Sequence, residues 1–198
     1  MKYLKSSVAS FVFLALMLIV YYVHVAFFQV NVVLYSAVLD ALIAAAVAAV
    51  ALFALSYFRG LNTFEKIQLM FIWILTGYIF AISIPTVIDR SLSLYILEKI
   101  QQRGGGIQLA RFEDVFTKEF AKEHRLVDVR LTEQEESGTV TIKDGCVLLT
   151  ERGKQIASFS RYFRLHFLPK RRLLMGEYSD ALTDPFRQSQ QAVDYGCK

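Results

Sequence analysis

VVLYSAVLDALIAAAVAAVALFALSYF, the stretch from Val32 to Phe58, contains no lysine or arginine and only one acidic residue. About 20 consecutive apolar residues are enough to cross a hydrocarbon core of about 30 Å, so this stretch predicts a membrane-spanning helix. Two further apolar runs flank it, at residues 8–28 and 67–88. The sequence therefore predicts three transmembrane helices.

The composition of the 198-residue chain changes after residue 88. Hydrophobic residues make up 55% of the chain and cluster before that point, which is typical of a membrane protein with a small appended domain. We expect a mostly α fold, with a three-span transmembrane domain at 1–88, a small α+β soluble domain at 89–168, and a basic then polar tail at 169–198. The first run is longer than a signal-peptide core and lacks a cleavage site, so we interpret it as a retained anchor.

The second span repeats small residues at helical spacing, and one acidic residue shares their face. Small side chains let helix backbones approach closely, and helix association in lipid depends on such packing. The pattern predicts a helix-packing or partner-binding face made of Ala37, Asp40, Ala44, Ala48 and Ala51. Leu42 falls on the opposite side, and Gly77 and Ala81 form a similar small pair in the third span.

Asp40 is a carboxylic acid inside a predicted span. An ionised carboxylate that faces lipid costs a few kcal/mol, so we expect this side chain to be protonated, paired or directed into a cavity. One interpretation makes it a ligand, proton or partner contact. The other makes it a carboxyl group that is hydrogen-bonded to Tyr or Ser in the bundle, or wetted near the membrane surface.

The third span ends in a segment that contains Pro85, Asp89 and Arg90. Proline lacks a backbone donor and disfavours helix before it, so the span is expected to kink or stop near Ile84. Either Asp89 or Ser91 can cap the helix that follows. The segment is compatible with a functional loop at the membrane surface and also with a simple structural end of the span.

Basic residues near the spans set the expected orientation, because cytoplasmic loops carry an excess of lysine and arginine. One side of the membrane receives the basic residues of the amino terminus and the second turn: Lys2, Lys5, Arg59 and Lys66. This places the amino terminus in the cytoplasm and the soluble domain outside it. The opposite orientation is favoured by Arg90, Lys99 and Arg103.

The soluble part predicts a helix after Ser91, a short strand at 107–110, helices at 112–123 and 126–135, a hairpin at 138–149 and a helix from Thr150. This order resembles a winged-helix domain over residues 91–163. The resemblance is carried by Arg130-Leu131 with Gln134, Gly138-Thr139-Val140, Asp144-Gly145 and the wing-closing run Leu149-Thr150-Glu151-Arg152-Gly153-Lys154-Gln155-Ile156-Ala157. One shared core is expected, in which Ile156, Phe159 and Phe163 pack on Leu92, Ile96, Phe116 and Leu131.

The winged-helix resemblance implies DNA binding through the second of the paired helices. Residues 125–136 instead hold two arginines against four acidic residues, a net charge of −2. Phosphate attraction supplies much of DNA affinity, so this helix predicts no DNA partner and suits docking to a protein.

A basic segment begins inside the last predicted helix, continues past its end and is interleaved with aromatic residues. It comprises Arg161, Arg164, Lys170, Arg171 and Arg172. Near an anionic membrane each such residue contributes on the order of 1 kcal/mol, so contact with anionic lipid is one interpretation. A solvated helix face followed by a basic loop is the other.

The sequence carries no recognisable catalytic, cofactor-binding or metal-binding motif, and its three histidines are isolated. Cys146 and Cys197 form neither a disulfide framework nor a zinc pattern, and a single bridge between them stays open. We expect a non-catalytic accessory or scaffold subunit of a bacterial inner-membrane complex, with membrane-protein partners and with self-association as a further option. The alternatives are a membrane-tethered winged-helix transcription regulator and a membrane enzyme, or enzyme subunit, that acts on a lipid-linked substrate.

Overall fold

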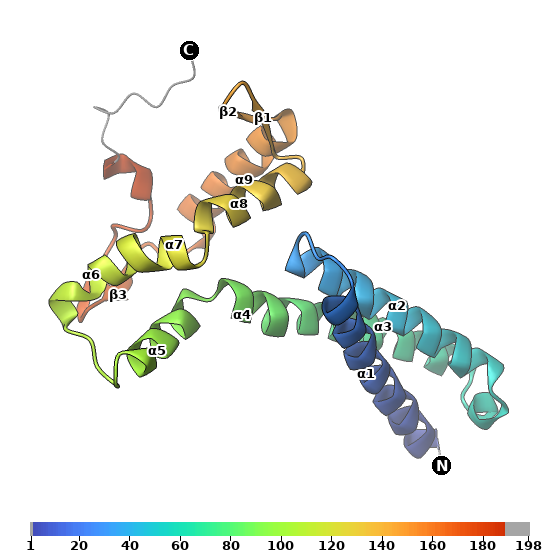
Figure 1. Ribbon diagram of the computed structural model, residues 1–198. Coiled ribbons are helices and arrows are strands. Elements are labelled where there is room, and N and C mark those ends of the chain that lie inside the picture. Colours follow the sequence, from blue (N-terminus) through green and yellow to red (C-terminus); the bar gives the residue numbers. More distant parts are fainter. Residues whose placement is uncertain (1, 189–198) are drawn as a thin grey trace. The chain divides into compact units, whose positions relative to one another are not determined.

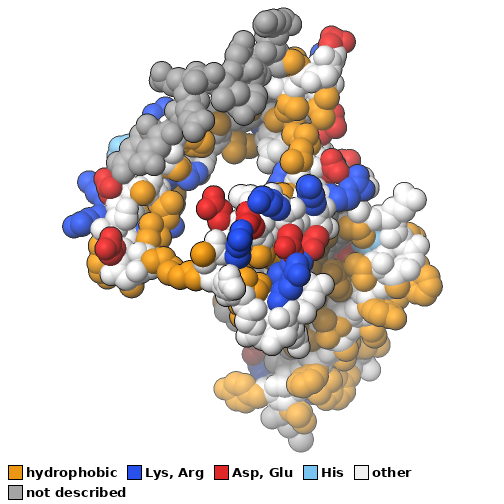
Figure 2. Space-filling view, turned by 60° about the vertical axis from the view of Figure 1, so that its left-hand side comes forward, with side chains coloured by type: hydrophobic (Ala, Val, Ile, Leu, Met, Phe, Trp, Pro, Cys, Tyr) orange, Lys and Arg blue, Asp and Glu red, His pale blue; other side chains and the backbone are white. Residues whose placement is uncertain are grey.

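The computed structural model describes residues 2–188, which are mostly helical. The chain divides into a first unit, Met1–His124, and a second unit, Arg125–Lys198 (Figure 1). Three helices of the first unit are long and apolar enough to cross a membrane. Their bounds are α1 Lys2–Phe27, α2 Val33–Ala54 and a third span, Thr63–Arg90. Hydrophobic side chains cover the outer surface of these helices, as expected where lipid replaces water (Figure 2).

The third span continues through Pro85 and does not stop at Ile84. It consists of α3 Thr63–Ala81, a π turn (η2) at Ile82–Thr86 and α4 Val87–Arg90. A proline removes one backbone donor and crowds the preceding turn, and the wider π turn accommodates both effects. The span ends at Ser91, whose hydroxyl accepts a hydrogen bond from the Leu94 N–H at 3.2 Å. Ser91 therefore caps the next helix, while Asp89 lies inside α4.

The small stripe of α2 packs inside the first unit. Phe13 of α1 stacks on Trp73 of α3 at a centroid distance of 5.3 Å, and both rings belong to the core that holds the alanines of α2. At Gly77 an added Cβ would lie 2.6 Å from the Ala41 Cβ, so only glycine permits this approach of α2 and α3. The three spans thus form a closely packed bundle, as the small residues predict.

The amino terminus and the turn between α2 and α3 lie at the same end of the bundle. Lys2 forms an ion pair of 2.8 Å with Glu65, the residue that completes a capping box with Asn62. The ammonium of Lys66 lies 4.9 Å from the centre of the Phe53 ring. The opposite end therefore holds the turn between α1 and α2 together with the π turn.

The rest of the first unit is a helical pair, made of α5 and of a second helical run that extends from η3 to α7. The bounds are α5 Leu92–Gln102, η3 Leu109–Arg111, α6 Phe112–Asp114, the π turn η4 Val115–Phe120 and α7 Ala121–Glu123. The helix expected at 112–123 is thus present, with a π turn inside it. The strand expected at 107–110 is wrong, because this stretch leads into a 3-10 turn.

The second unit contains two helices and two hairpins. Its elements are α8 Leu126–Glu136, β1 Val140–Lys143, β2 Cys146–Leu149, α9 Glu151–Phe167, β3 Arg172–Leu174, β4 Glu177–Ser179 and η5 Pro185–Gln188. The first hairpin pairs Val140 with Leu149 and turns at Asp144-Gly145, where both residues have positive φ. Thr150 caps α9 by accepting from the Gly153 N–H at 3.1 Å. The predicted hairpin and capped helix are therefore both observed, and β3–β4 was not expected.

Within the second unit, the large side chains of the α9 apolar stripe stay exposed instead of forming the core expected there. Phe159 is 65% exposed, Phe163 43% and Ile156 49%. Within the described part of the second unit, Thr139 and Gly153 are the buried residues, and neither has a large side chain. Gly153 is buried because α9 passes so close to the Thr139 carbonyl and Leu149 that a Cβ would collide with both. The backbone packs closely here, while the large apolar side chains stay outside.

Candidate functional site

A carboxylate and an imidazole meet at the end of the bundle that holds the α1–α2 turn. The Nδ1 of His24 lies 2.7 Å from the Oδ1 of Asp40. Asp40 is only 2% exposed and stands seven residues into α2, roughly 10 Å from the start of the helix. His24, in the last turn of α1, is 21% exposed and connects this buried acid to the surface of the bundle.

The second carboxylate oxygen of Asp40 is buried and has no hydrogen-bond partner in the described part of the chain. Asp40 is also one of the residues that line a cleft of about 360 Å³ on the outer side of α1 and α2. Six apolar side chains line the cleft beside the pair: Ile19, Val20, Val23, Phe28, Leu39 and Ile43. Asp40 therefore has a pairing partner and also lines a cavity, two of the situations expected for a carboxylic acid inside a span. Its partner is His24 rather than Tyr or Ser.

Other polar groups gather at this end of the bundle. Tyr21 of α1 lies within electrostatic range of both Asp40 and Asp89, and its ring meets Phe80 edge-on at 5.5 Å. Thr86, in the π turn, has a buried hydroxyl that finds no hydrogen-bond partner among the described residues. The end of the bundle away from Lys2 thus combines acids, an imidazole and hydroxyls within apolar surroundings.

The residues predicted from the small stripe are brought together, and they face the chain's own helices. Buried positions within the first unit are taken by Ala37, Asp40, Ala44, Ala48, Gly77 and Ala81, while Ala51 is half-buried. The packing face of α2 is therefore already covered by α1 and α3.

The segment predicted at the membrane surface is helical. Pro85 is buried in the π turn, Asp89 is exposed in α4, and Arg90 is half-buried at the end of the third span. Asp89 and Arg90 are thus presented by a helix end rather than by a loop.

The predicted basic segment is partly engaged inside the second unit. Arg161 approaches Asp184 at 3.9 Å, and Arg171 donates to the Tyr178 carbonyl at 3.2 Å. Arg164 is half-buried, and Lys170 and Arg172 are exposed. Arg125, which precedes α8, pairs with Asp128 at 2.8 Å, and Arg130 within α8 pairs with Glu133 at 2.6 Å, so both arginines already have acidic neighbours.

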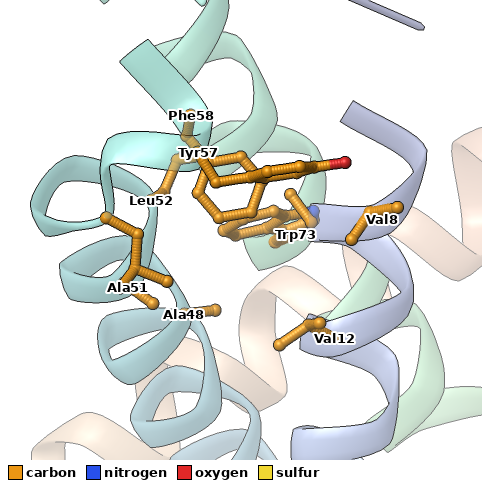
Figure 3. A pocket seen from close by; sticks show the side chains of 10 residues that line it. Val8, Val12, Ala48, Ala51, Leu52, Tyr57, Phe58 and Trp73 are labelled. Atoms are coloured by element: carbon orange, nitrogen blue, oxygen red, sulfur yellow. The ribbon is translucent and has the colours of Figure 1, made fainter. Parts of the chain in front are cut away.

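A second apolar cavity of about 260 Å³ lies toward the other end of the bundle (Figure 3). Val8 and Val12 of α1 face it from one side and Ala48, Ala51 and Leu52 of α2 from the other, with Trp73 at its base. Its lining residues, all within the described part of the chain, include no buried unpartnered polar atom like the Oδ2 of Asp40. We therefore take the His24–Asp40 cleft as the candidate site.

An ion-pair cluster joins α5 to η4 and α7 outside the spans. Lys99, which is buried, contacts Glu119 at 2.8 Å and Glu123 at 2.6 Å, and Tyr95 donates to Glu123 at 2.7 Å. Donation of hydrogen bonds to Glu119 and Glu123 raises the pKa of Lys99. Hydrogen bonds from Lys99 in turn lower the pKa of Glu119 and of Glu123. Because each charge has a partner, we interpret the cluster as structural: its ion pairs hold α5 against the helical run that contains Glu119 and Glu123.

Sequence reasoning missed the role of His24, although a signal was present. Between residues 6 and 58, His24 and Asp40 are the only residues of the Asp, Glu, Lys, Arg and His types. A short turn between antiparallel spans brings the end of the first toward the start of the second, where these two groups lie. In hydrocarbon, two ionisable groups on facing spans are expected to pair.

Comparison with protein-family models, with curated proteins and with solved structures finds no match. Among the described residues no group of three His, Cys, Asp or Glu side chains is placed to hold a metal ion. The chemistry of the chain's own surfaces is therefore the basis for a functional proposal.

Proposed function

We propose that this chain is a membrane-anchored accessory or scaffold subunit of a larger complex, and that its second unit docks on a protein partner. The spans hold the chain in the membrane, and the exposed apolar stripe of α9 forms the docking face. The α9 stripe is defined here as Ile156, Phe159, Phe163 and Phe167.

The observation that carries this proposal is the absence of buried large side chains from residues 125–186, the part of the second unit whose burial is described. Burial of apolar surface is the main favourable term in folding. A unit with four aligned and exposed hydrophobic side chains therefore keeps in water an apolar surface whose burial would be favourable. Aromatic residues are also the side chains most enriched in protein interfaces. A partner that covers the α9 stripe supplies the missing core.

The paired arginines of α8 favour a protein partner over DNA. Arg125 and Arg130 each have an acidic neighbour, and the helix carries net negative charge. A DNA reader needs free positive charge at this position. We propose that the hairpin and α9 are the winged part of a winged-helix-like module used for protein docking.

We further propose that the protein resides in a bacterial inner membrane, with its amino terminus in the cytoplasm and its second unit outside. Lys2 and Lys66 lie at one end of the bundle, in keeping with the positive-inside rule. Cys146 is disulfide-bonded, and disulfides persist in oxidising compartments. Cys197 lies outside the described residues. A reporter fused after Lys198 should be active only outside the cytoplasm, and activity inside would reverse the orientation.

Copurification tests the proposed docking function. The double variant Phe159→Ser with Phe163→Ser should release a partner that copurifies with the unchanged chain in fixed stoichiometry. Val127→Ser is the matched control, because Val127 is equally exposed but lies on α8. The proposal fails if the unchanged chain purifies alone and remains functional, or if the control releases the partner as completely as the double variant. A second copy of the chain as the copurifying protein would make the complex a homo-oligomer.

A specific observation also supports action on a lipid-linked substrate as a second candidate function. The π turn at Ile82–Thr86 places Asp89 and Arg90 at the end of the third span, and π turns recur at functional sites. An arginine at that depth can meet the phosphate of a lipid-linked substrate. Asp89→Asn with Arg90→Ala should then abolish function while leaving membrane insertion intact, and retained function would remove this candidate.

A further inference from the structure

The His24–Asp40 cleft combines a lipid-facing wall with one unsatisfied polar atom. Ile19, Leu39 and Ile43 are exposed on the outer side of α1 and α2, so in a bilayer they face acyl chains. Asp40 lines the same cleft, and its buried Oδ2 has no partner in the described part of the chain. Within the hydrocarbon region water cannot be counted on to hydrogen-bond such an atom, so leaving it unpaired is costly.

We propose that this cleft binds a long-chain alcohol from the bilayer, whose hydroxyl group donates a hydrogen bond to Oδ2 of Asp40. The chain of the alcohol lies along the apolar wall, and the hydroxyl reaches the carboxylate beside His24. A cleft of about 360 Å³ falls at the small end of the usual range for ligand sites, which suits a single chain.

The chemistry of the pair selects a hydroxyl over other polar heads. An anionic head is repelled by the Asp40 carboxylate. A cationic head is not needed, because the imidazole of His24 already lies 2.7 Å from Oδ1, and burial of an additional charge in the span is expensive. A hydroxyl satisfies the remaining oxygen without bringing a charge into the membrane.

Photocrosslinking of the purified full chain tests this assignment. The chain is placed in phosphatidylcholine nanodiscs, because the choline headgroup offers no hydrogen-bond donor. The probe is hexadecanol with a diazirine and an alkyne in its chain, and the matched control is the methyl ether of the same molecule. The labelled peptides are mapped by mass spectrometry.

The alcohol should label the segments at residues 19–28 and 39–43 about tenfold more strongly than the ether, since the ether cannot donate and leaves a buried acceptor unpaired. Asp40→Leu should reduce alcohol labelling to the level of the ether, whose labelling also reports that the cleft is intact. Leu42→Ala, on the other side of α2, should leave both signals unchanged. Excess unlabelled hexadecanol, but not its ether, should displace the probe from the unmodified chain.

Three results would overturn the proposal: equal labelling by alcohol and ether, alcohol labelling that survives Asp40→Leu, and displacement of the probe by either competitor alike. Crosslinking of the cleft to another protein in native membranes, with no labelling by the alcohol, would also overturn it by showing a helix in the cleft. If Asp40→Leu removes the labelling by both probes, the competition on the unmodified chain decides the outcome.

Discussion

The three-span bundle and the second unit both bring backbones close together through a glycine, but only the bundle closes a core around that contact. At Gly77, α2 and α3 approach beside the stacked rings of Phe13 and Trp73. At Gly153, α9 approaches the first hairpin, yet Phe159 and Phe163 of the same helix stay exposed. The difference teaches that the bundle buries its own large side chains, whereas the second unit, taken by itself, leaves the apolar face of α9 exposed.

Truncation of an aromatic ring in each unit should give the largest contrast. Trp73→Ala should lower the free energy of unfolding by about 3 to 5 kcal/mol, because Trp73 is 2% exposed and its loss leaves a cavity in the bundle. Phe159→Ala should change it by only about 0.5 kcal/mol, as at other surface sites. Far-UV circular dichroism during SDS titration in mixed micelles measures both. Similar losses in the two variants would mean that the stripe is buried after all.

Enlargement of the small stripe should have an intermediate effect. Ala44→Leu adds bulk at a fully buried position of α2, and overpacking of this kind costs about 1 to 3 kcal/mol. Leu42→Ala is the control, since Leu42 faces away from the bundle and is exposed. The same titration compares them. If Leu42→Ala destabilises the protein more than Ala44→Leu, the assignment of the packing face is wrong.

Much of the bundle could be predicted from the sequence, because apolar length and small-residue spacing report directly on spans and on their packing faces. Ala44 and Gly77 follow from that periodicity. The partner of the stripe could not be predicted, since the same alanines suit a helix of this chain or of another. The irregularity at Pro85 was expected as a kink or a stop, but its form as a π turn was not predicted, because a π turn depends on the packing around the proline.

In the second unit, features that depend on neighbouring residues were predicted correctly, while the packing of distant residues was not. The hairpin turn at Asp144-Gly145 and the Thr150 cap are set by neighbouring residues, and both are observed. The core expected around Phe159 depended on the winged-helix resemblance, which local pattern cannot verify. The candidate site was predicted in part. Asp40 was identified from the free-energy cost of placing a carboxylate in lipid, but its pairing with His24 depends on how the first two spans face each other.

The smallest expected effect concerns the helical pair of α5 and α7. Hydrogen bonds from Lys99 lower the pKa of Glu119 and Glu123 below the ordinary 4.5. Their stabilising contribution is therefore present above that value and is lost as the pH falls through the lowered pKa. The raised pKa of Lys99 gives the reverse at alkaline pH, where its contribution is lost as the pH rises through the raised value.

Carbon NMR of the glutamate carboxyl groups checks this expectation. Both carboxyl groups should titrate below the ordinary value in the unchanged chain and return toward it in Lys99→Met. A titration of Glu119 and Glu123 that does not respond to Lys99→Met would show that Lys99 does not hold these carboxylates, and the cluster would then not fasten the pair.

The central claim is that the α9 stripe is open in this chain alone and covered in the assembled complex. Maleimide labelling of Phe159→Cys tests it most directly, in a chain that also carries Cys146→Ser and Cys197→Ser. Ala44→Cys serves as the buried reference. We expect the cysteine at position 159 to react rapidly in the purified protein and to be protected in native membranes, while the one at position 44 is protected in both. Protection of position 159 in the purified protein, or equal reactivity in both settings, would contradict the account.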